Sequence, residues 1–252
     1  MRLKNLLVTS ALSTVVALSG PAAAEDNWDF TTTAYGWFAG LSGTVETPIG
    51  DVETEVDFGD ILESLDIAFL GAFDARKNRL SLIADVQYFD LSSDVDVPTG
   101  ALFSGGEADS QTVLLSAYAA YALVDNDDMR FELGGGLRYT YADIDVDLVG
   151  QEPVADQSVS VDGDYVDLLI AARLTRNFTD RLYGVAFADV GGFGIEDSSD
   201  LTWQAAGVVG YRFNEKWSVL GGYRHLSIHR EFGPTDTTTE VSGPFLGFQA
   251  SF

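Results

Sequence analysis

The sequence contains no cysteine in its 252 residues, so no disulfide bond can stabilise the fold. Basic residues are scarce as well, because 14 lysines and arginines stand against 39 aspartates and glutamates and give a formal net charge of −25. A chain this acidic is repelled by phosphate backbones, which argues against nucleic-acid binding. Beyond the N-terminal segment, no apolar run approaches the roughly 20 residues that a transmembrane helix needs.

The first residues, MRLKNLLVTSALSTVVALSGPAAA, have the pattern of a secretory signal peptide. A basic head precedes an apolar stretch, and Ala22 and Ala24 frame an A-x-A cleavage site. The apolar stretch is interrupted by polar residues and is too short for a membrane anchor. We therefore expect residues 1–24 to be removed on export. Residues 25–252 are expected to form one domain, because no linker divides them.

Apolar and polar residues alternate with a period of two along most of the remaining chain. In MRFELGGGLRYTY, Phe131 and Leu133 share one face, while Glu132 and Arg138 lie on the other. The same alternation recurs in TVLLSAYAAYAL and TWQAAGVVGYRF. Successive side chains of a strand point to opposite faces, so these segments are predicted to be β-strands with one apolar and one polar face.

Two all-β architectures produce such alternation, a soluble β-sandwich and a transmembrane β-barrel. Sandwich strands usually have about five or six residues and carry charge on the solvent face. Here the segments run to ten or more residues, and their apolar faces end in tyrosine, tryptophan or phenylalanine. Those features are typical of strands that face lipid and close around a polar interior, which leaves no unpaired edge. The sequence therefore predicts an all-β fold, a transmembrane antiparallel up-and-down β-barrel.

The barrel is predicted to have about ten strands, with eight as the alternative. The strands are expected near 28–41, 65–76, 79–92, 111–123, 129–143, 164–176, 181–193, 201–213, 217–230 and 241–252. Short turns connect them at one end, and the longer loops at the other end are expected at 42–64, 93–110, 144–163 and 231–240. Outer-membrane barrels have this arrangement, with the short turns in the periplasm. We expect a monomer in the outer membrane.

Charged residues on the polar faces are predicted to point into the barrel. The predicted interior charge network consists of Asp74, Arg76, Asp85, Glu132, Arg138, Asp167, Arg173, Asp189, Arg212 and Arg224. Acidic and arginine side chains are comparable in number, so they can pair, whereas unpaired charges in a narrow lumen would be costly. A barrel of this size has room for side chains or one small ligand. A salt-bridge network that fills the lumen is therefore favoured over a narrow polar pore.

The polarity of the two faces inverts beyond a tyrosine in several strands, which indicates that the wall leaves the lipid and continues into water. The inward residues there are apolar, and the predicted lining of the upper lumen is Phe89, Leu91, Ile144, Val146, Leu226 and Ile228. A short helix in the first long extracellular loop is predicted to cover this lining as a lid, through Phe58, Ile61, Leu62 and Leu65. The alternative filler is a hydrophobic ligand that enters from outside.

The last strand, within GPFLGFQASF, places Leu246, Phe248 and Phe252 on its outward face. This C-terminus, together with AYGWFAGLSGTVE, DVGGFG and TWQAAGVVGYRFNEKWSVLGGYRHLSI, resembles a widespread family of uncharacterised bacterial outer-membrane β-barrel proteins. That family is loosely similar to the small OmpA- and OmpW-type barrels. The resemblance implies outer-membrane localisation and a C-terminal signal, at the three residues named above, for the barrel-insertion machinery. It implies no activity, and His225 and His229 depart from the family's pattern.

The sequence contains no recognisable metal, cofactor or catalytic motif. Acidic segments such as DIDVDL do not follow a calcium-binding loop, so only weak association with divalent cations is expected. The two histidines lie near the predicted outer rim, but neither a nucleophile elbow nor a metalloprotease motif accompanies them. We expect no cofactor, no dedicated metal site and no catalysis.

The expected role is structural, or that of a surface-interaction protein in contact with outer-membrane lipid and lipopolysaccharide. The alternative is a narrow passive channel or a binder of small or hydrophobic molecules. An outer-membrane hydrolase or lipid-modifying enzyme is the least favoured reading of the sequence.

Overall fold

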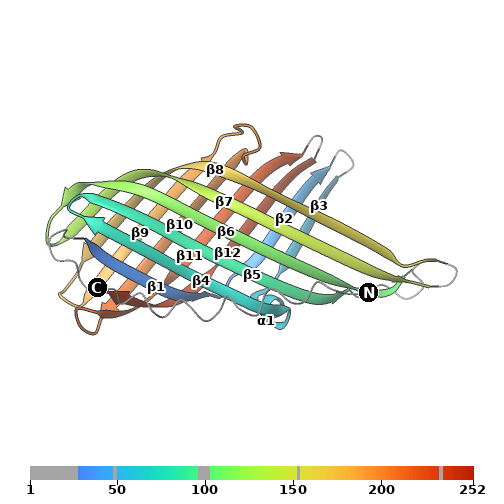
Figure 1. Ribbon diagram of the computed structural model, residues 1–252, viewed down its shortest axis with the longest axis horizontal. Coiled ribbons are helices and arrows are strands. Elements are labelled where there is room, and N and C mark those ends of the chain that lie inside the picture. The colour runs from blue at the N-terminus through green and yellow to red at the C-terminus, as the bar shows by residue number, and fades with distance from the viewer. Residues whose placement is uncertain (1–27, 48–49, 96–102, 152–153, 233–234) are drawn as a thin grey trace.

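The computed structural model describes residues 28–47, 50–95, 103–151, 154–232 and 235–252 (Figure 1). Within these ranges, twelve strands form one antiparallel sheet. The strands are β1 (Asp29–Trp37), β2 (Gly40–Thr47), β3 (Gly50–Val56), β4 (Leu65–Lys77), β5 (Leu80–Val95), β6 (Phe103–Asp125), β7 (Met129–Gly150), β8 (Gln157–Asn177), β9 (Leu182–Gly192), β10 (Leu201–Arg212), β11 (Trp217–Phe232) and β12 (Thr235–Ser251). One short helix, α1 (Phe58–Glu63), lies between β3 and β4. No helix in the described part of the chain is long and apolar enough to cross a membrane. The predicted signal peptide lies outside these residues.

The sheet closes because its first and last strands pair with each other. Residues 31–37 of β1 pair antiparallel with residues 245–251 of β12, and the other edge of β1 pairs with β4. From β4 onward each strand pairs with the next one along the chain. Strands β1 and β4–β12 therefore form a closed ten-stranded barrel, which confirms the predicted fold class and decides against eight strands.

Strands β2 and β3 form a hairpin on the rim of this barrel. The chain bends at Phe38 and Ala39, and β2 then continues along the same strand, β12, that β1 pairs with. Gly243 lies opposite the bend, where an added Cβ would come within 2.3 Å of the Phe38 carbonyl oxygen. Only glycine permits so close an approach of two backbones. The described part of β3 pairs with β2 alone, so this hairpin extends the wall without adding to the closed cylinder.

The turns at one end of the barrel are short and are fixed by side chains that accept hydrogen bonds from the backbone. Asn126 Oδ1 accepts from the amides of residues 128 and 129, and Asn214 Oδ1 accepts from those of residues 216 and 217. Thr179 Oγ1 does the same for residues 181 and 182. Asn and Thr close turns in this way because their short side chains reach the backbone two or three residues ahead. In outer-membrane barrels the short turns lie in the periplasm, so we call this the periplasmic end.

The strands at the opposite end are much longer than the sequence predicted. Strands β6, β7 and β8 contain 23, 22 and 21 residues, whereas about 9–11 residues cross a bilayer. Most of the predicted loops 93–110 and 144–163 is therefore strand, which corrects the predicted strand ends. We call the projecting parts of β5–β8 the extension; its described residues are 93–95, 103–110, 143–150 and 157–163. Figure 1 shows it as the long tapering end of the molecule. The period-two alternation continues through it with inverted polarity, so the backbone stays extended.

The barrel has its polar residues inside and its apolar residues outside. Arg138, Glu132 and Asp167 are fully buried, whereas Leu168 and Ile170 are 50% and 61% exposed. This distribution is the reverse of that in a soluble domain, where charged side chains are almost never fully buried. It is stable when the exposed side chains contact acyl chains instead of water.

Candidate functional site

The lumen is layered along the barrel axis, and the layer nearest the periplasmic turns is a charged cluster. Arg173 of β8 donates from Nε to Glu132 Oε2 at 2.5 Å, and from Nη1 across the lumen to Asp74 Oδ2 of β4. Asp74 also pairs with Arg76, and Glu132 with Arg130, each at 3.0 Å. Each of the two carboxylates therefore contacts two guanidinium groups. We call these five residues the lower cluster.

A second polar layer crosses the lumen above the lower cluster. Arg138 of β7 donates to Asp189 Oδ2 of β9 at 2.9 Å and to Thr202 Oγ1 of β10 at 2.7 Å. Tyr118 of β6 donates to the same carboxylate oxygen at 2.8 Å, and Gln204 Nε2 donates to the Tyr118 hydroxyl at 3.0 Å. All of these hydrogen bonds join strands that are not neighbours in the sheet.

This layer continues to the other side of the barrel through Arg224 of β11. Its Nε donates to Gln204 Oε1 at 2.9 Å, and its Nη1 donates to Asp85 Oδ1 of β5 at 3.1 Å. Asp85 also accepts from the Tyr35 hydroxyl of β1 at 2.7 Å. We call the whole set the cross-lumen belt; its members are Tyr35, Asp85, Tyr118, Arg138, Asp189, Thr202, Gln204 and Arg224. The belt joins seven strands around the barrel, so it fixes the shape of the lumen as well as filling it.

Two predicted members of the interior network form no ion pair among the described residues. Asp167 is fully buried, and its Oδ1 accepts from the amide and the hydroxyl of Ser199, both at 2.8 Å. Arg212 donates to Asn177 Oδ1 at 2.9 Å and lies 4.3 Å over the ring of Tyr183. The other eight predicted residues each take part in an ion pair of the lower cluster or the belt.

An apolar layer covers the belt on its extracellular side. Trp37, Leu70, Leu114 and Leu226 are buried together, and Trp37 lies two residues beyond Tyr35 on the same face of the wall. The Arg224 guanidinium lies 5.0 Å from the centre of the Trp37 ring, so the apolar layer rests directly on the belt. Residues Tyr35, Phe89, Ile228, Val241 and Phe245 pack around it.

Five of the six residues predicted to line the upper lumen separate into two groups. Leu226 is 2% exposed, and Phe89 and Ile228 pack against the apolar layer with it. Ile144, which is 45% exposed, belongs to the extension instead, and Val146 lies two residues further along the same strand. Leu91 is partly buried and pairs with Leu65 at the start of β4.

The predicted lid helix forms, but it does not fill the lumen. Helix α1 has no buried residue, and Leu62 is 55% exposed. Phe58 makes an edge-to-face contact with Phe38, with ring centres 5.3 Å apart, and Phe38 itself points away from the lumen. The apolar layer consists of side chains of the wall itself, and no residue of the helix belongs to it. The contacts therefore do not support the lid prediction for Phe58, Ile61, Leu62 and Leu65.

The extension has an acidic outer face and an apolar inner face. On the inner face Ile144 pairs with Val161 and Val146 pairs with Val159 across β7 and β8, and Val159 and Val161 are 57% and 63% exposed. On the outer face acidic residues lie directly opposite one another, as in the cross-strand pairs Asp143–Asp162, Asp109–Asp145 and Glu107–Asp147. Like charges directly opposite one another destabilise a sheet, so the stability of the sheet does not explain why acidic residues occupy its outer face.

His225 lies on the outer surface of the barrel, near the extracellular rim. Its Nδ1 hydrogen-bonds to Ser242 Oγ, and its ring lies tilted by 39° against that of Trp203, with ring centres 4.6 Å apart. Its Nε2 is 4.0 Å from Glu240 Oε1, which is beyond hydrogen-bond distance. His229 contacts Thr238 Oγ1 at 3.0 Å and is not part of this group.

The C-terminal residues lie on the outside of the wall. Leu246, Phe248 and Phe252 are 58%, 50% and 65% exposed. The Phe252 ring stacks on Phe30 at 6.0 Å, and that of Phe248 stacks on Trp217 at 5.1 Å. These side chains form part of an aromatic girdle at the periplasmic edge of the lipid-facing band.

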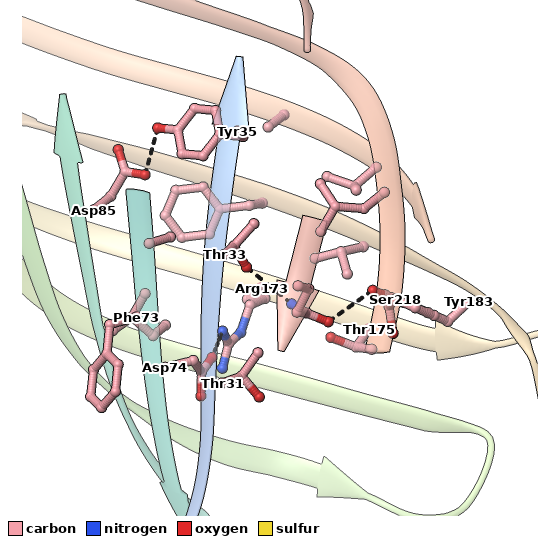
Figure 2. A pocket seen from close by; sticks show the side chains of 18 of the residues that line it. Thr31, Thr33, Tyr35, Phe73, Asp74, Asp85, Arg173, Thr175, Tyr183 and Ser218 are labelled. Atoms are coloured by element: carbon pink, nitrogen blue, oxygen red, sulfur yellow. Dashed lines mark hydrogen bonds and ion pairs between the residues drawn. The ribbon is translucent and has the colours of Figure 1, made fainter. Parts of the chain in front are cut away.

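A cavity of about 350 Å³ lies in the lumen between the belt and the periplasmic turns. Figure 2 shows Arg173, Asp74, Thr31 and Thr33 around it, with Tyr35 and Asp85 of the belt at one end. Glu215 of the exposed turn between β10 and β11 lines the other end, so the cavity opens toward the periplasm. The described part of the chain contains no group of three or more potential ligands that could hold a metal ion.

Sequence reasoning missed several polar residues that complete these layers. Tyr118 and Gln204 hold Asp189, Arg130 joins the lower cluster, and Ser81 donates to Glu132 Oε1 at 2.6 Å. All of them lie on inward faces that period-two alternation identifies. Their roles depend on which strands face one another across the lumen, which alternation does not reveal. Alternation does predict which residues point inward, but not their partners.

Comparison with protein-family models gives no match, and no curated protein matches the chain. Solved structures do match. The outer-membrane protease OmpT from Escherichia coli has a TM-score of 0.50 and 11% identity, with 90% of this chain and 97% of that chain covered. The translocator domain of the autotransporter NalP from Neisseria meningitidis has a TM-score of 0.43 and 14% identity, covering 91% and 90%. Ail, the attachment invasion locus protein of Yersinia pestis, has a TM-score of 0.37 and 10% identity, covering 90% and 100%.

Identities this low establish the fold and nothing about activity. OmpT, with the TM-score of 0.50, is an outer-membrane protein, and the shared fold agrees with what the resemblance of the sequence to small outer-membrane barrels implied. The chain is therefore an outer-membrane β-barrel protein.

Proposed function

We propose that this outer-membrane β-barrel protein is a surface-interaction protein that neither conducts nor catalyses. Its barrel anchors the extension in the membrane, and the extension presents an amphipathic sheet to the outside. The cross-lumen belt is the observation that carries this proposal, because it leaves no continuous path for ions through the lumen.

The burial of the belt supports a closed lumen. Arg138 is fully buried, and Gln204 and Asp189 are 3% and 4% exposed. A water-filled pore passing through this layer would wet these side chains. The apolar layer covers the belt on the extracellular side, so an ion would have to cross Trp37 and Leu226 as well as the belt. Crossing an apolar layer without water carries a large desolvation cost for any ion.

The extension supports the interaction role. Monomeric proteins seldom expose contiguous apolar surface without a function for it, and Val159 and Val161 are more than half exposed on the inner face. The acidic residues of the outer face keep the sheet soluble beyond the membrane. They also fit the expected weak association with divalent cations and lipopolysaccharide, because cations relieve repulsion between paired carboxylates.

Planar-bilayer recording of the refolded protein tests the closed lumen. We expect no channel currents from the native protein. The double variant Trp37→Ala with Arg224→Ala removes one large side chain from the apolar layer and one from the belt, so it should show discrete steps of current. A matched variant on the outer wall, Tyr223→Ala, should stay silent because Tyr223 is 55% exposed on the lipid side. Steady steps from the native protein would refute the proposal and favour a narrow channel.

Binding of small hydrophobic molecules is the second candidate function, and the exposed inner face of the extension favours it. An apolar fluorescent dye should bind the native protein and lose affinity when Val159 and Val161 are both changed to Thr. Both side chains are already exposed, so the change should leave the melting temperature almost unaffected. Equal dye binding by both proteins would count against this candidate.

The geometry around His225 supports the absence of catalysis. A base–nucleophile pair needs an orienting group on the other ring nitrogen, but Glu240 is 4.0 Å away. The backbone amides of β11 and β12 face each other in a ladder, so they do not form an oxyanion hole. Ester hydrolysis by the purified protein that disappears in Ser242→Ala would overturn this part of the proposal.

A further inference from the structure

We propose that the free edge of β8 in the extension binds an extended cationic segment of another protein or peptide, which adds a strand to the sheet. We call residues 157–164 of β8 the edge segment. Because it names a partner for the extension, this proposal rests on the surface-interaction role proposed above. Three features of the edge segment support it: backbone groups without a partner strand, exposed apolar side chains on the inner face and acidic side chains on the outer face.

The edge segment pairs with a strand on one side only. Residues 157–164 pair with residues 141–148 of β7, whereas pairing of β8 with β9 begins at Leu169. Every residue of the edge segment is exposed, and Figure 1 shows β8 along one border of the tapering end. The free edge ends at Tyr165, because the guanidinium of Arg230 lies 4.3 Å from the centre of its ring. No strand in the described part of the chain therefore covers this edge.

The backbone groups that point out of the edge can be identified from the pairing of β7 with β8. The amide of Asn177 donates to the carbonyl oxygen of Asp128, on the β7 side, and the pairing then runs without a bulge to Gln157. Alternate residues of an antiparallel pair bond to the partner strand, so odd-numbered residues of β8 bond to β7. The residues whose amide and carbonyl groups point away from β7 are therefore Ser158, Ser160, Asp162 and Asp164. Such a row of unpaired groups is a template for another strand.

The two faces of the edge segment define the side chains of the partner strand. On the inner face Val159 and Val161 are 57% and 63% exposed, and a Cβ added at Gly163 would meet nothing within 4 Å. The outer face carries Ser158, Ser160, Asp162 and Asp164. Directly opposite residues on neighbouring strands place their side chains on the same face. A strand that alternates apolar and basic residues therefore extends both faces.

The charge of the extension selects a cationic partner. Its described residues contain seven acidic and no basic side chains, namely Asp94, Glu107, Asp109, Asp143, Asp145, Asp147 and Asp162. Asp162 lies opposite Asp143, and a basic residue on its other side turns an unfavourable cross-strand contact into a favourable one. A second copy of this chain brings the same aspartates to the edge, so like-charge repulsion disfavours pairing between two copies.

The test measures binding of a labelled peptide of alternating lysine and valine, as long as the edge segment, to the full mature protein in phosphatidylcholine nanodiscs. Fluorescence anisotropy reports the affinity, and these discs carry no anionic lipid that attracts the peptide. The lysines lie opposite the outward-pointing residues, so their amides bond to the edge. Methylation of the lysine amides should weaken binding at least about tenfold, because several hydrogen bonds are lost. Methylation of the valine amides, which point away from the edge, is the matched control and should change little.

Two changes in the protein test the same contact from the other side. Ser160→Pro removes an outward-pointing amide, which the sheet tolerates because that amide does not bond to β7, and it should weaken binding about tenfold. Ser160→Ala keeps the amide and should bind as the native protein does. Asp162→Asn with Asp164→Asn should weaken binding about two- to fivefold for each charge removed. The control, Glu107→Gln with Asp109→Asn, removes the same charge from β6, two strands away from the edge.

The proposal is overturned if the peptide does not bind at millimolar concentration, if the two methylated peptides bind equally, or if Ser160→Pro binds as tightly as Ser160→Ala. It is also overturned if the native protein sediments as a dimer that Ser160→Pro converts to a monomer, because a second copy then occupies the edge. Bilayer recording of the same preparation keeps the two proposals separate. Current steps from the native protein refute the proposed function, whereas the peptide results refute only the docking edge.

Discussion

The cross-lumen belt allows a sharp test of what holds the barrel together, through the single change Asp189→Asn. Asp189 accepts hydrogen bonds from Arg138, Tyr118 and Gln204, and it is 4% exposed. Asparagine keeps the shape of the side chain but removes its charge and replaces one acceptor oxygen with a donor. Arg138, which is fully buried, then has no counter-ion in contact.

The expected cost follows from the burial of the pair. Removing one partner of a buried ion pair leaves an uncompensated charge and typically costs about 3–5 kcal/mol. Replacing both partners with apolar residues of similar volume is often neutral, because the desolvation of both charges is avoided as well. We therefore expect Asp189→Asn to lower the free energy of unfolding by about 3–5 kcal/mol, and the double variant Arg138→Met with Asp189→Leu to recover most of that loss.

The assay is reversible denaturant unfolding of the barrel in lipid vesicles, followed by tryptophan fluorescence. Asp125→Asn is the matched control, because Asp125 pairs with Arg130 at 2.7 Å but its side chain is 33% exposed. Exposed pairs contribute about 0–1 kcal/mol, so the control should change little. A loss below about 1 kcal/mol for Asp189→Asn, equal to that of the control, would refute the view that the belt is a dry, paired layer.

Three further changes test other parts of the structure. Gly134→Ala should destabilise the barrel by about 1–3 kcal/mol, because the added Cβ would lie 2.3 Å from the Ala119 carbonyl oxygen. The control Gly207→Ala adds a Cβ that meets nothing within 4 Å, so it should be neutral or slightly stabilising in the same unfolding assay. Asp143→Asn should raise the melting temperature at low salt, because it removes the like-charge pair with Asp162. Magnesium should raise the melting temperature of the native protein, and this rise should be smaller in the variant. Deleting Phe252, which stacks on Phe30 and bonds to its backbone, should reduce the amount of protein in the outer-membrane fraction of cells, measured by fractionation.

Much of the wall could be predicted from the sequence because one rule governs it. In β7, Phe131 and Leu133 face lipid and Glu132 faces the lumen, as alternation requires for a strand between two environments. The same rule identified the inward charges before any partner was known. A strand fixes the direction of each side chain locally, so this information is present in a short segment of sequence.

The partners in the lumen could not be predicted because they depend on closure. Arg173 reaches Asp74, which is 99 residues away in the sequence, and Arg224 reaches Asp85, which is 139 residues away. Which strands oppose each other depends on the number of strands and on their tilt. The ends of β6–β8 were also misplaced, because residues 93–110 and 144–163 were predicted to be loops, although the inverted polarity had been interpreted as a wall that continues into water. The strands continue there, since a sheet in water tolerates polar residues on its outer face.

The same inversion explains why the two ends of the lumen differ chemically. Where lipid surrounds the wall, the inner face carries the polar residues, and it forms the lower cluster, the belt and the cavity. Where water surrounds the wall, the outer face must be polar, so the inner face becomes apolar at Leu226 and Ile228. The apolar layer lies at this boundary, so in the closed lumen that we propose, closure is a consequence of the wall's passage from lipid into water. A molecule arriving from outside would then meet an apolar surface and one arriving from the periplasm would meet arginines, and for this reason we expect no single polar solute to pass between the two ends.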